Sequence, residues 1–414
     1  MPVCKRMLRD AHALHSAFVG PHAIVAPPKG HNGMERWRWW RVAVQRTGME
    51  AAACGRCQGR QETGARLITD EQGALRRVLR GIGGAVLMLA CLAMGAWGGL
   101  ALWFQFPGNT VARVVAIMAW CVPCVWALRA SFARRRRWHS LAVFAAGFVL
   151  LLGWWATIQP RQDRQWADDV AQPLHARIDG DRLLLDNVRD FHWRGEDDYD
   201  VRWERREYDL SQVRSVDLLL SYWMGPAIAH TLVSFGFADG RQLVFSLEIR
   251  KERGESFSAL GGFFRRFEAV LVAADERDIV QVRTSVRGED VYLYRLHGLD
   301  QDEMRQLLRY YVAQAQALER APAFYNTLTS NCTTIVYELM HRIVPALPLD
   351  HRLLLSGYLA EYAADVGGLA PGVPYAELRE RGRITLRARE AGDTADFSRR
   401  IREGVPGIPE GGAP

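Results

Sequence analysis

HTLVSFGFADGRQLVFSLEIR, at residues 230–250, decides the fold of this sequence. Two runs rich in β-branched and aromatic residues flank the tetrapeptide ADGR, and Asp-Gly between such runs is a strong signal for a β-hairpin. The first strand opens at His230, and the second strand carries Ser246 and Glu248 as polar members. We therefore expect an antiparallel sheet that holds a histidine rigidly at the start of a strand.

The length of the turn decides which side chains of this hairpin meet. A two-residue turn at Asp239-Gly240 sets His230 opposite Ile249 and places Glu248 on the other face of the sheet. A bulge or a longer turn shifts the register and brings Glu248 to the side of His230. The sequence leaves both registers open, and a solvated Glu248 is the alternative to a partner of the histidine.

A second decisive stretch, TSNCTTIVYELM at residues 329–340, combines a cap signal with an amphipathic helix. Its apolar residues recur at helical spacing, and Ser330 or Asn331 would cap the helix that they define. Cys332 then lies in the first turn, where free backbone N–H groups and the helix dipole favour a thiolate and lower its pKa. The stretch predicts either a reactive thiol or, as the alternative, a small buried hydrophobe.

The other segments beyond residue 159 complete an α+β pattern. We expect a second helix at residues 301–319, and mixed helix and loop after residue 346 with the last ten residues disordered. The helix that begins near Cys332 should pack on a mainly antiparallel sheet. Its strands are expected near residues 182–187, 213–221, 230–237, 242–250, 269–273 and 278–296.

Three apolar runs precede this region. The chain of 414 residues is 49% apolar and 24% charged, which is typical of a folded protein, but residues 81–104 carry no charge at all. Two further runs follow at residues 111–130 and 140–158. Each is long enough to cross a hydrocarbon core of about 30 Å as a helix. Three transmembrane helices are expected, because three such runs with short connections are hard to bury in a soluble protein.

Arginines between the runs predict the orientation in the membrane. Residues 129–137, between the second and third runs, contain Arg129 and four consecutive arginines, whereas residues 105–110 carry no charge. The positive-inside rule makes the arginine-rich connection cytoplasmic. The N-terminus is then cytoplasmic, and the region after about residue 159 is extracytoplasmic.

Four regions follow from these patterns. Residues 1–75 are expected to be a disordered tail or the product of an upstream start codon, and residues 76–158 hold the three membrane helices. Residues 159–345 form the extracytoplasmic core, and residues 346–414 extend the same domain with helix and loop. The oligomeric state is not predicted.

Several function classes find no support in the sequence. Cys54 and Cys57 form a lone C-x-x-C without a second pair, which disfavours a zinc site. No Gly-rich phosphate loop or clustered metal ligands occur, so neither a cofactor nor a metal is expected. The net charge of +7 comes largely from arginines spread over the chain, without a nucleic-acid-binding module.

Cys332 is the one cysteine of seven that lies beyond the membrane runs, so an internal disulfide of that region is impossible. A thiol nucleophile usually needs a base. His341 lies about half a turn out of phase with Cys332 on the same helix and is a poor base. His230 is the better candidate because a strand fixes its orientation. Glu248 would hold the imidazole tautomer as the third member of a triad.

The motifs around both residues resemble a known family. AHTLVSFGFADGRQLVFSLEIRKERGE and FYNTLTSNCTT look like the membrane-anchored bacterial proteins that carry the Lnb N-terminal periplasmic domain, Lnb being a lipoprotein N-acyltransferase. The likeness extends over about residues 185–405 and includes SALGGFFRRFE, ADERD, RGEDVYLYRL and FSRRIREGVPG. Three helices before the domain depart from the anchors expected elsewhere in the family, which leaves the substrate open.

The resemblance implies a permuted papain-like α+β domain, similar to relatives of NlpC-type cysteine peptidases, at the periplasmic side of the bacterial inner (cytoplasmic) membrane. Cys332 would be the acyl-accepting nucleophile and His230 its base. The partners would be a membrane lipid or a bacterial lipoprotein, whose acyl chain passes through a thioester to an amine. Contacts to substrate or oxyanion would come from Asn331, Thr333, Tyr325 and Asn326, the last two with a structural role as alternative.

Two other functions remain open at this stage. A cysteine peptidase or amidase of cell wall or periplasmic protein would use the same thiol and histidine but hydrolyse the acyl-enzyme. A non-catalytic membrane scaffold would not need the thiol at all. The peptidase or amidase would act on peptides in the absence of lipid. The scaffold would be unaffected by Cys332→Ala.

Overall fold

A computed structural model of the chain describes residues 75–132 and 137–409. Three of its helices are long and apolar enough to cross a membrane, as expected: Leu75–Gln105, Thr110–Ala130 and Trp138–Thr157. The last two spans belong to α3 (Thr110–Phe132) and α4 (Arg137–Thr157). Most side chains of the three helices are open to the surroundings, which suits helices that face lipid. The predictions on residues 1–74, including Cys54 and Cys57, lie outside the described residues.

Small residues let the membrane helices pack closely. A Cβ added at Gly98 would lie 2.6 Å from the indole nitrogen of Trp120, so only glycine fits there. The same indole N–H donates to the carbonyl of Gly95 at 2.9 Å. Close backbone approach and a satisfied polar group are what helix pairs in lipid require.

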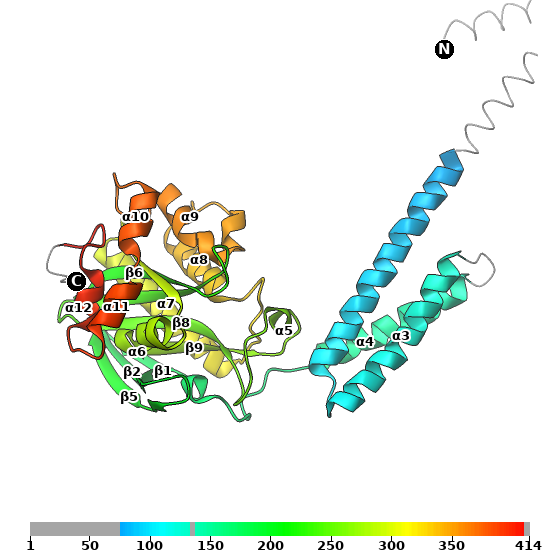
Figure 1. Cartoon of the computed structure of the whole chain (residues 1–414), viewed down its shortest axis with the longest axis horizontal. Coiled ribbons are helices and arrows are strands. Elements are labelled where there is room, and N and C mark those ends of the chain that lie inside the picture. Colours follow the sequence, from blue (N-terminus) through cyan, green and yellow to red (C-terminus); the bar gives the residue numbers. More distant parts are fainter. Residues whose placement is uncertain (1–74, 133–136, 410–414) are drawn as a thin grey trace, which may run out of the picture. The chain divides into compact units, whose positions relative to one another are not determined.

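The region after α4 is built on one mixed sheet with the order β1-β2-β9-β8-β7-β6-β10, and β5 pairs with β2 (Figure 1). Neighbouring strands run antiparallel except β2 and β9, which are parallel. The predicted α+β class with a mainly antiparallel sheet is therefore confirmed. The strands are β1 (His175–Asp179), β2 (Arg182–Arg189), β5 (Trp203–Asp209), β6 (Val213–Tyr222), β7 (Ala229–Phe237), β8 (Gln242–Arg250), β9 (Glu268–Asp275) and β10 (Asp290–Arg295), with a separate pair β3 (His192–Trp193) and β4 (Tyr199–Asp200).

Helices cover both faces of the sheet (Figure 1). One face packs in a large apolar core with α7 and α8, and the other packs in a second core with α6, α11 and α12. Strand β7 shows the alternation, because Val233 and Phe235 belong to the first core and Leu232 to the second. The helices are α5 (Ala259–Phe263), α6 (Glu276–Gln281), α7 (Gln301–Arg320), α8 (Cys332–Ile343), α9 (Leu359–Asp365), α10 (Tyr375–Gly382), α11 (Thr385–Ala391) and α12 (Phe397–Arg402), with short turns η1 (Asp168–Val170), η2 (Leu210–Gln212), η3 (Val282–Val286), η4 (His351–Leu353) and η5 (Ser356–Tyr358).

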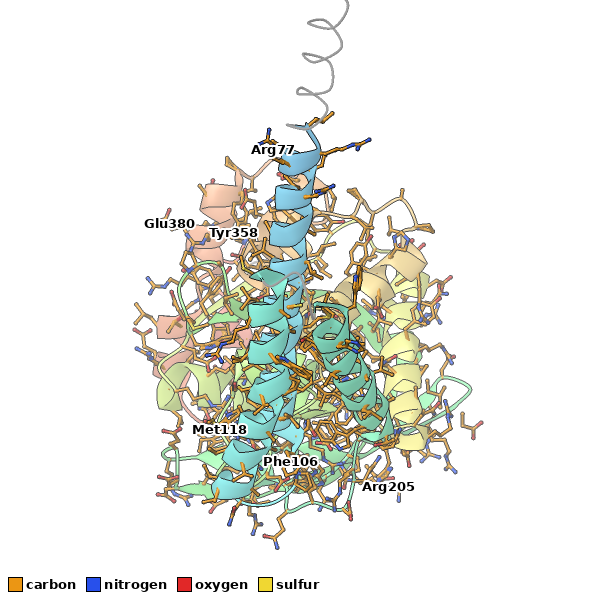
Figure 2. All side chains as sticks on the ribbon, turned by 90° about the vertical axis from the view of Figure 1, so that its right-hand side faces the viewer. Arg77, Phe106, Met118, Arg205, Tyr358 and Glu380 are labelled. Carbon is orange, nitrogen blue, oxygen red and sulfur yellow. The ribbon has the colours of Figure 1, made fainter. Side chains whose placement is uncertain are left out.

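Surface character differs between the membrane helices and the domain that follows them (Figure 2). Met118 on α3 is 64% exposed, and such apolar exposure on a helix suits contact with lipid. Arg205 on β5 and Glu380 on α10 are exposed charged residues, as expected for a surface in water. The two regions therefore face different solvents.

Two expectations about the fold are wrong. Residues 278–296 do not form one strand: α6 and a single π-helical turn at η3 precede β10. Asp275 caps α6 by accepting the Arg277 N–H, and acidic Glu276 and Asp278 suit its first turn, so the β-branched residues that follow are buried from a helix. The last ten residues are also not wholly disordered, because Val405 is buried in the second core.

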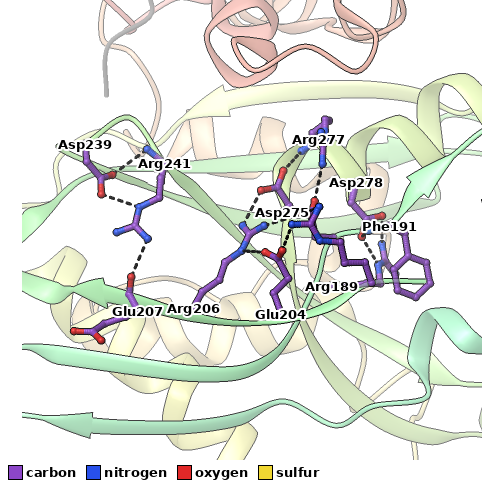
Figure 3. Close-up of polar contacts among 12 residues, drawn as sticks. Arg189, Phe191, Glu204, Arg206, Glu207, Asp239, Arg241, Asp275, Arg277 and Asp278 are labelled. Carbon is purple, nitrogen blue, oxygen red and sulfur yellow. Dashed lines mark hydrogen bonds and ion pairs between the residues drawn. The ribbon is translucent and has the colours of Figure 1, made fainter. Parts of the chain in front are cut away.

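Buried ion pairs fix α6 on the sheet (Figure 3). Asp278 on α6 accepts two hydrogen bonds from the Arg189 guanidinium on β2, at 2.8 and 3.2 Å. It also accepts the Phe191 N–H at 3.0 Å. Because both charged groups are almost fully buried, they need each other, and loss of either would leave an unpaired charge in the core. This contact sets the position of the π-helical turn that follows α6.

Candidate active site

Cys332 is the first residue of α8, as the sequence predicts. The Asn331 side chain accepts the N–H groups of Thr333 and Thr334, both at 2.9 Å, and the Thr334 hydroxyl oxygen accepts the Asn331 N–H at 2.8 Å. This reciprocal cap fixes where the helix starts. The Cys332 side chain is buried, with 6% of the residue exposed.

Strand β7 meets the start of α8 where it parts from β8. The paired register between β7 and β8 ends at Val233 and Phe245, so the first residues of β7 have no ladder partner on that side. The Thr231 N–H acts on the Cys332 thiol and helps to lower its pKa. The hydroxyls of Thr231 and Thr333 lie 3.2 Å apart and join the strand to the helix. The opening between the strands therefore admits the thiol.

The turn of the hairpin contains three residues, not two. The Phe237 N–H bonds to the Arg241 carbonyl at 3.0 Å, and Gly240 takes a positive φ of 86° that suits glycine. The register that follows pairs Phe235 with Leu243, and its continuation sets His230 across from Glu248. Of the two registers left open by the sequence, the one with Ile249 opposite His230 is wrong.

Three polar side chains surround the ring of His230. Its Nε2 lies 2.7 Å from Ser246 Oγ and 3.2 Å from Glu248 Oε1. The Ser246 hydroxyl donates to Glu248 at 2.7 Å, and Arg283 Nη2 donates to the same carboxylate oxygen at 2.9 Å. A carboxylate at Nε2 holds a proton on that nitrogen. The sequence-predicted residues Cys332, His230 and Glu248 thus come together in one site.

The charges of this site favour a thiolate and an imidazolium. Burial opposes ionisation of the Cys332 thiol, but the charge and hydrogen bond of His230 and the Thr231 N–H lower its pKa below the ordinary value. Burial also disfavours the imidazolium, yet Glu248 and Cys332 raise the pKa of His230 to about 9. The Glu248 carboxyl has a pKa well below its usual range, because His230 and Arg283 outweigh its burial. A thiolate is the reactive form of cysteine.

Tyr325 lies at the thiol as well. The residue is 7% exposed, and its hydroxyl shares hydrogen bonds with both the backbone and the side chain of Cys332. Burial and the nearby sulfur raise the pKa of Tyr325 far above its ordinary value, so the hydroxyl keeps its proton. The backbone N–H of Cys332 is not used by the Asn331 cap, and it interacts with the Tyr325 hydroxyl. Both groups lie beside the sulfur.

The other candidates for substrate contacts have structural partners. Asn331 is fully engaged in the cap, since its amide also donates to the Thr327 carbonyl at 2.8 Å. The Asn326 side chain accepts the N–H groups of Leu328 and Thr329 and thereby shapes the loop before α8. Thr333 faces Thr231. The side chains of Asn331, Asn326 and Thr333 are therefore all engaged in contacts within the protein.

Arg283 is the residue that the sequence reasoning missed. It lies in the π-helical turn η3, inside a segment that was expected to be a strand, and only 4% of its side chain is exposed. Single π-helical turns occur often at functional sites. The geometry could not be foreseen because the position of η3 depends on the ion pair of Asp278 with Arg189 far away in the sequence.

Two other histidines of the domain, His175 and His192, pair with carboxylates. His175 contacts Glu319 at 2.8 Å, and His192 contacts Asp393 at 3.1 Å. In the described part of the chain, no group of three or more His, Cys, Asp or Glu side chains could hold a metal ion.

One protein-family model matches part of the chain. The family model of the Lnb N-terminal periplasmic domain matches residues 199–357, a stretch that contains His230, Glu248, Arg283 and Cys332. No curated protein and no solved structure matches the chain. With its three apolar helices, the chain is a membrane protein with a periplasmic domain. Residues 199–357 belong to the Lnb N-terminal periplasmic domain family that the sequence motifs resemble.

Proposed function

We propose that this protein is a membrane-anchored cysteine acyltransferase that moves an acyl chain from a membrane lipid, through a thioester on Cys332, to the amine of a bacterial lipoprotein. The observation that carries the proposal is the buried pair of Cys332 and His230, in which each group favours the charged form of the other. The domain that carries this pair is attached to three membrane helices, which suits a substrate that stays in the bilayer.

In the first half of the reaction, the Cys332 thiolate attacks the ester carbonyl of the donor. The new C–S bond forms as the C–O bond of the ester breaks. The leaving alkoxide takes the proton from the His230 imidazolium and departs as the alcohol of a lysolipid. A neutral thioester and a neutral imidazole remain, because the thiolate has lost its negative charge and the imidazolium its positive charge.

In the second half, an amine attacks the thioester carbonyl. The C–N bond forms, the C–S bond breaks, and the proton of the attacking amine passes to His230. The products are an amide and the original thiolate–imidazolium pair. In both steps Glu248 holds the His230 ring in place. Its Oε1 lies 3.2 Å from Nε2, where the carboxylate stabilises the imidazolium.

The developing oxyanion has two donors close to the sulfur. The Tyr325 hydroxyl and the Cys332 N–H, which both lie near the thiol, would donate to this oxyanion. Donors that are fixed before the reaction contribute more than donors that must reorient. The near-complete burial of Cys332 also limits water, which supports transfer to an amine over hydrolysis.

We also propose on which side of the membrane the domain lies. Arginines between the second and third spans argue for a cytoplasmic connection there, so the N-terminus would be cytoplasmic and the domain would lie on the periplasmic side of the inner membrane.

Mass spectrometry of a reporter diacyl lipoprotein tests the activity. The reporter is expressed in cells depleted of their own N-acyltransferase, together with this protein, its Cys332→Ala variant, or Cys121→Ala as a matched control with an exposed thiol on α3. The account predicts an added acyl mass with the parent and with Cys121→Ala, and none with Cys332→Ala at equal abundance. An unchanged reporter in all three would reject lipoprotein acylation, and release of free fatty acid instead would indicate a hydrolase.

A further inference from the structure

Six large apolar side chains on three loops are exposed in the periplasmic domain. We call them the apolar rim: Trp223, Met224, Phe257, Leu260, Phe263 and Leu328, each at least 42% exposed. Soluble surfaces rarely gather this many large apolar groups without a partner.

The loops of the rim contact one another. The rings of Trp223 and Phe257 meet edge to face with centroids 6.0 Å apart. Leu260 and Phe263 lie three residues apart on α5 and share one side of it. The Thr327 hydroxyl donates to the Ala259 carbonyl at 2.8 Å and so joins the loop that carries Leu328 to α5.

The three loops also lack charge. Residues 222–229, 256–264 and 321–337 contain no Asp, Glu, Lys or Arg, although 24% of the chain is charged. These stretches carry no charge of their own, and the charged residues Glu255, Arg265 and Arg266 lie next to the second stretch. An apolar surface with charges beside it suits the boundary between lipid headgroups and acyl chains, where tryptophan and phenylalanine are favoured.

The rim flanks the candidate site. Trp223 and Met224 lie in the turn that leads into β7 and His230, and Leu328 lies four residues before Cys332. Both residues of the thiol–imidazole pair are therefore carried by segments that begin in the rim. A surface that contacts the rim therefore also lies close to the start of the segments that lead to His230 and Cys332.

Chain connectivity keeps the rim within reach of the bilayer. Helix α4 ends at Thr157, and the Arg161 N–H already bonds to Glu268 at the start of β9 at 2.9 Å. Four residues span at most about 14 Å. Glu268 follows Phe263 by five residues, which span at most about 18 Å, so with the Glu268 side chain included α5 stays within about 40 Å of the end of a membrane-spanning helix.

We propose that the apolar rim inserts into the outer interface of the same bilayer that holds the three helices. The occupant is lipid: the acyl-chain region just beneath the headgroups. The domain is then held with the approach to Cys332 at the lipid surface. The inference depends on the rim and the tether and not on the thiol chemistry.

Photo-crosslinking in lipid nanodiscs tests this inference with the full chain. Nanodiscs of phosphatidylethanolamine and phosphatidylglycerol carry a trace of a phosphatidylcholine with a diazirine on its acyl chain, and crosslinked peptides are mapped by mass spectrometry after illumination. Peptides with the rim should be labelled several-fold more than the peptide around Leu386 on α11, an exposed leucine outside the rim. Equal labelling of the two would overturn the proposal.

A pair of variants makes the test specific. Leu260→Asp with Phe263→Asp should reduce labelling of all three rim loops several-fold, while Leu386→Asp should leave it unchanged, with folding checked by circular dichroism. Cys332→Ala should be labelled like the parent. Persistent rim labelling in the double variant would contradict insertion, and a failure of acyl transfer would leave the labelling result intact, so the two proposals fail separately.

Discussion

The carboxylate of Glu248 lies 3.2 Å from Nε2 of His230, on neighbouring strands whose paired ladder has already ended. Glu248 and Ser246 hold Nε2 of the imidazole, and the same ring lowers the pKa of the Cys332 thiol. The strand that carries the base also supplies the Thr231 N–H to the sulfur. The place where two inner strands of the sheet, β7 and β8, stop pairing thus orients the base and stabilises the nucleophile.

Acyl transfer should show a bell-shaped dependence on pH. The pKa of Cys332 is lowered, so the thiolate is lost only when the pH falls through that lowered value. The pKa of His230 is raised to about 9, so the imidazolium that protonates the leaving group is lost as the pH rises through about 9. Activity against a soluble thioester or ester donor, measured as kcat/KM over the pH range, checks this. A plain rise up to the pKa of an ordinary thiol would contradict the ion pair.

Variants of Glu248 and Arg283 should move the alkaline limb of that profile in opposite directions. Glu248 raises the pKa of His230 and Arg283 lowers it. Glu248→Gln should therefore shift the limb to lower pH and Arg283→Gln to higher pH, each with a loss of kcat on the order of 10- to 100-fold from poorer positioning. Parallel shifts, or no shift in either variant, would show that Glu248 acts only in packing.

Loss of the Tyr325 hydroxyl should affect kcat more than KM. Removal of one oxyanion donor typically costs on the order of 100-fold in kcat. Tyr325→Phe keeps the buried ring, so the thermal unfolding midpoint should change little. The control is Tyr311→Phe, because Tyr311 is buried in the core near the same thiol. Equal losses in both variants would point to packing and would remove Tyr325 from the oxyanion site.

Asn331 should behave as a helix cap. Asn331→Ala removes the acceptor for two N–H groups of α8 and should lower the free energy of unfolding by about 1 kcal/mol. Asn331→Asp keeps the acceptor, and it should retain most of the stability and a measurable fraction of the activity. Denaturant unfolding and the transfer assay together check this. Full stability with complete loss of activity in both variants would instead make Asn331 a catalytic donor.

Local patterns in the sequence predicted much of the fold. The hairpin of β7 and β8 followed from Asp-Gly between β-rich runs, and α8 with its cap followed from helical spacing after Asn331. Apolar run length predicted the three membrane helices. These features depend on neighbours in the chain, which is why a sequence alone reveals them.

Features that depend on distant contacts were not predictable. The three-residue turn decides whether Glu248 faces His230, and turn length could not be fixed from ADGR alone. The segment around Arg283 has strand-like composition but folds as a helix, because Asp275 caps it and Arg189 pairs with Asp278. Cys332, His230 and Glu248 could be named from sequence as candidates, whereas the ion pairing that unites them with Arg283 required the structure.

The most direct test is the intact mass of the protein after a single exposure to donor lipid without an acceptor amine. The account predicts a mass increase equal to one acyl group, removed by neutral hydroxylamine and mapped to Cys332. The adduct should be absent from Cys332→Ala and formed more slowly by His230→Asn. A stable, folded protein that gains no hydroxylamine-sensitive mass from any phospholipid or diacyl lipoprotein donor would contradict the thioester mechanism.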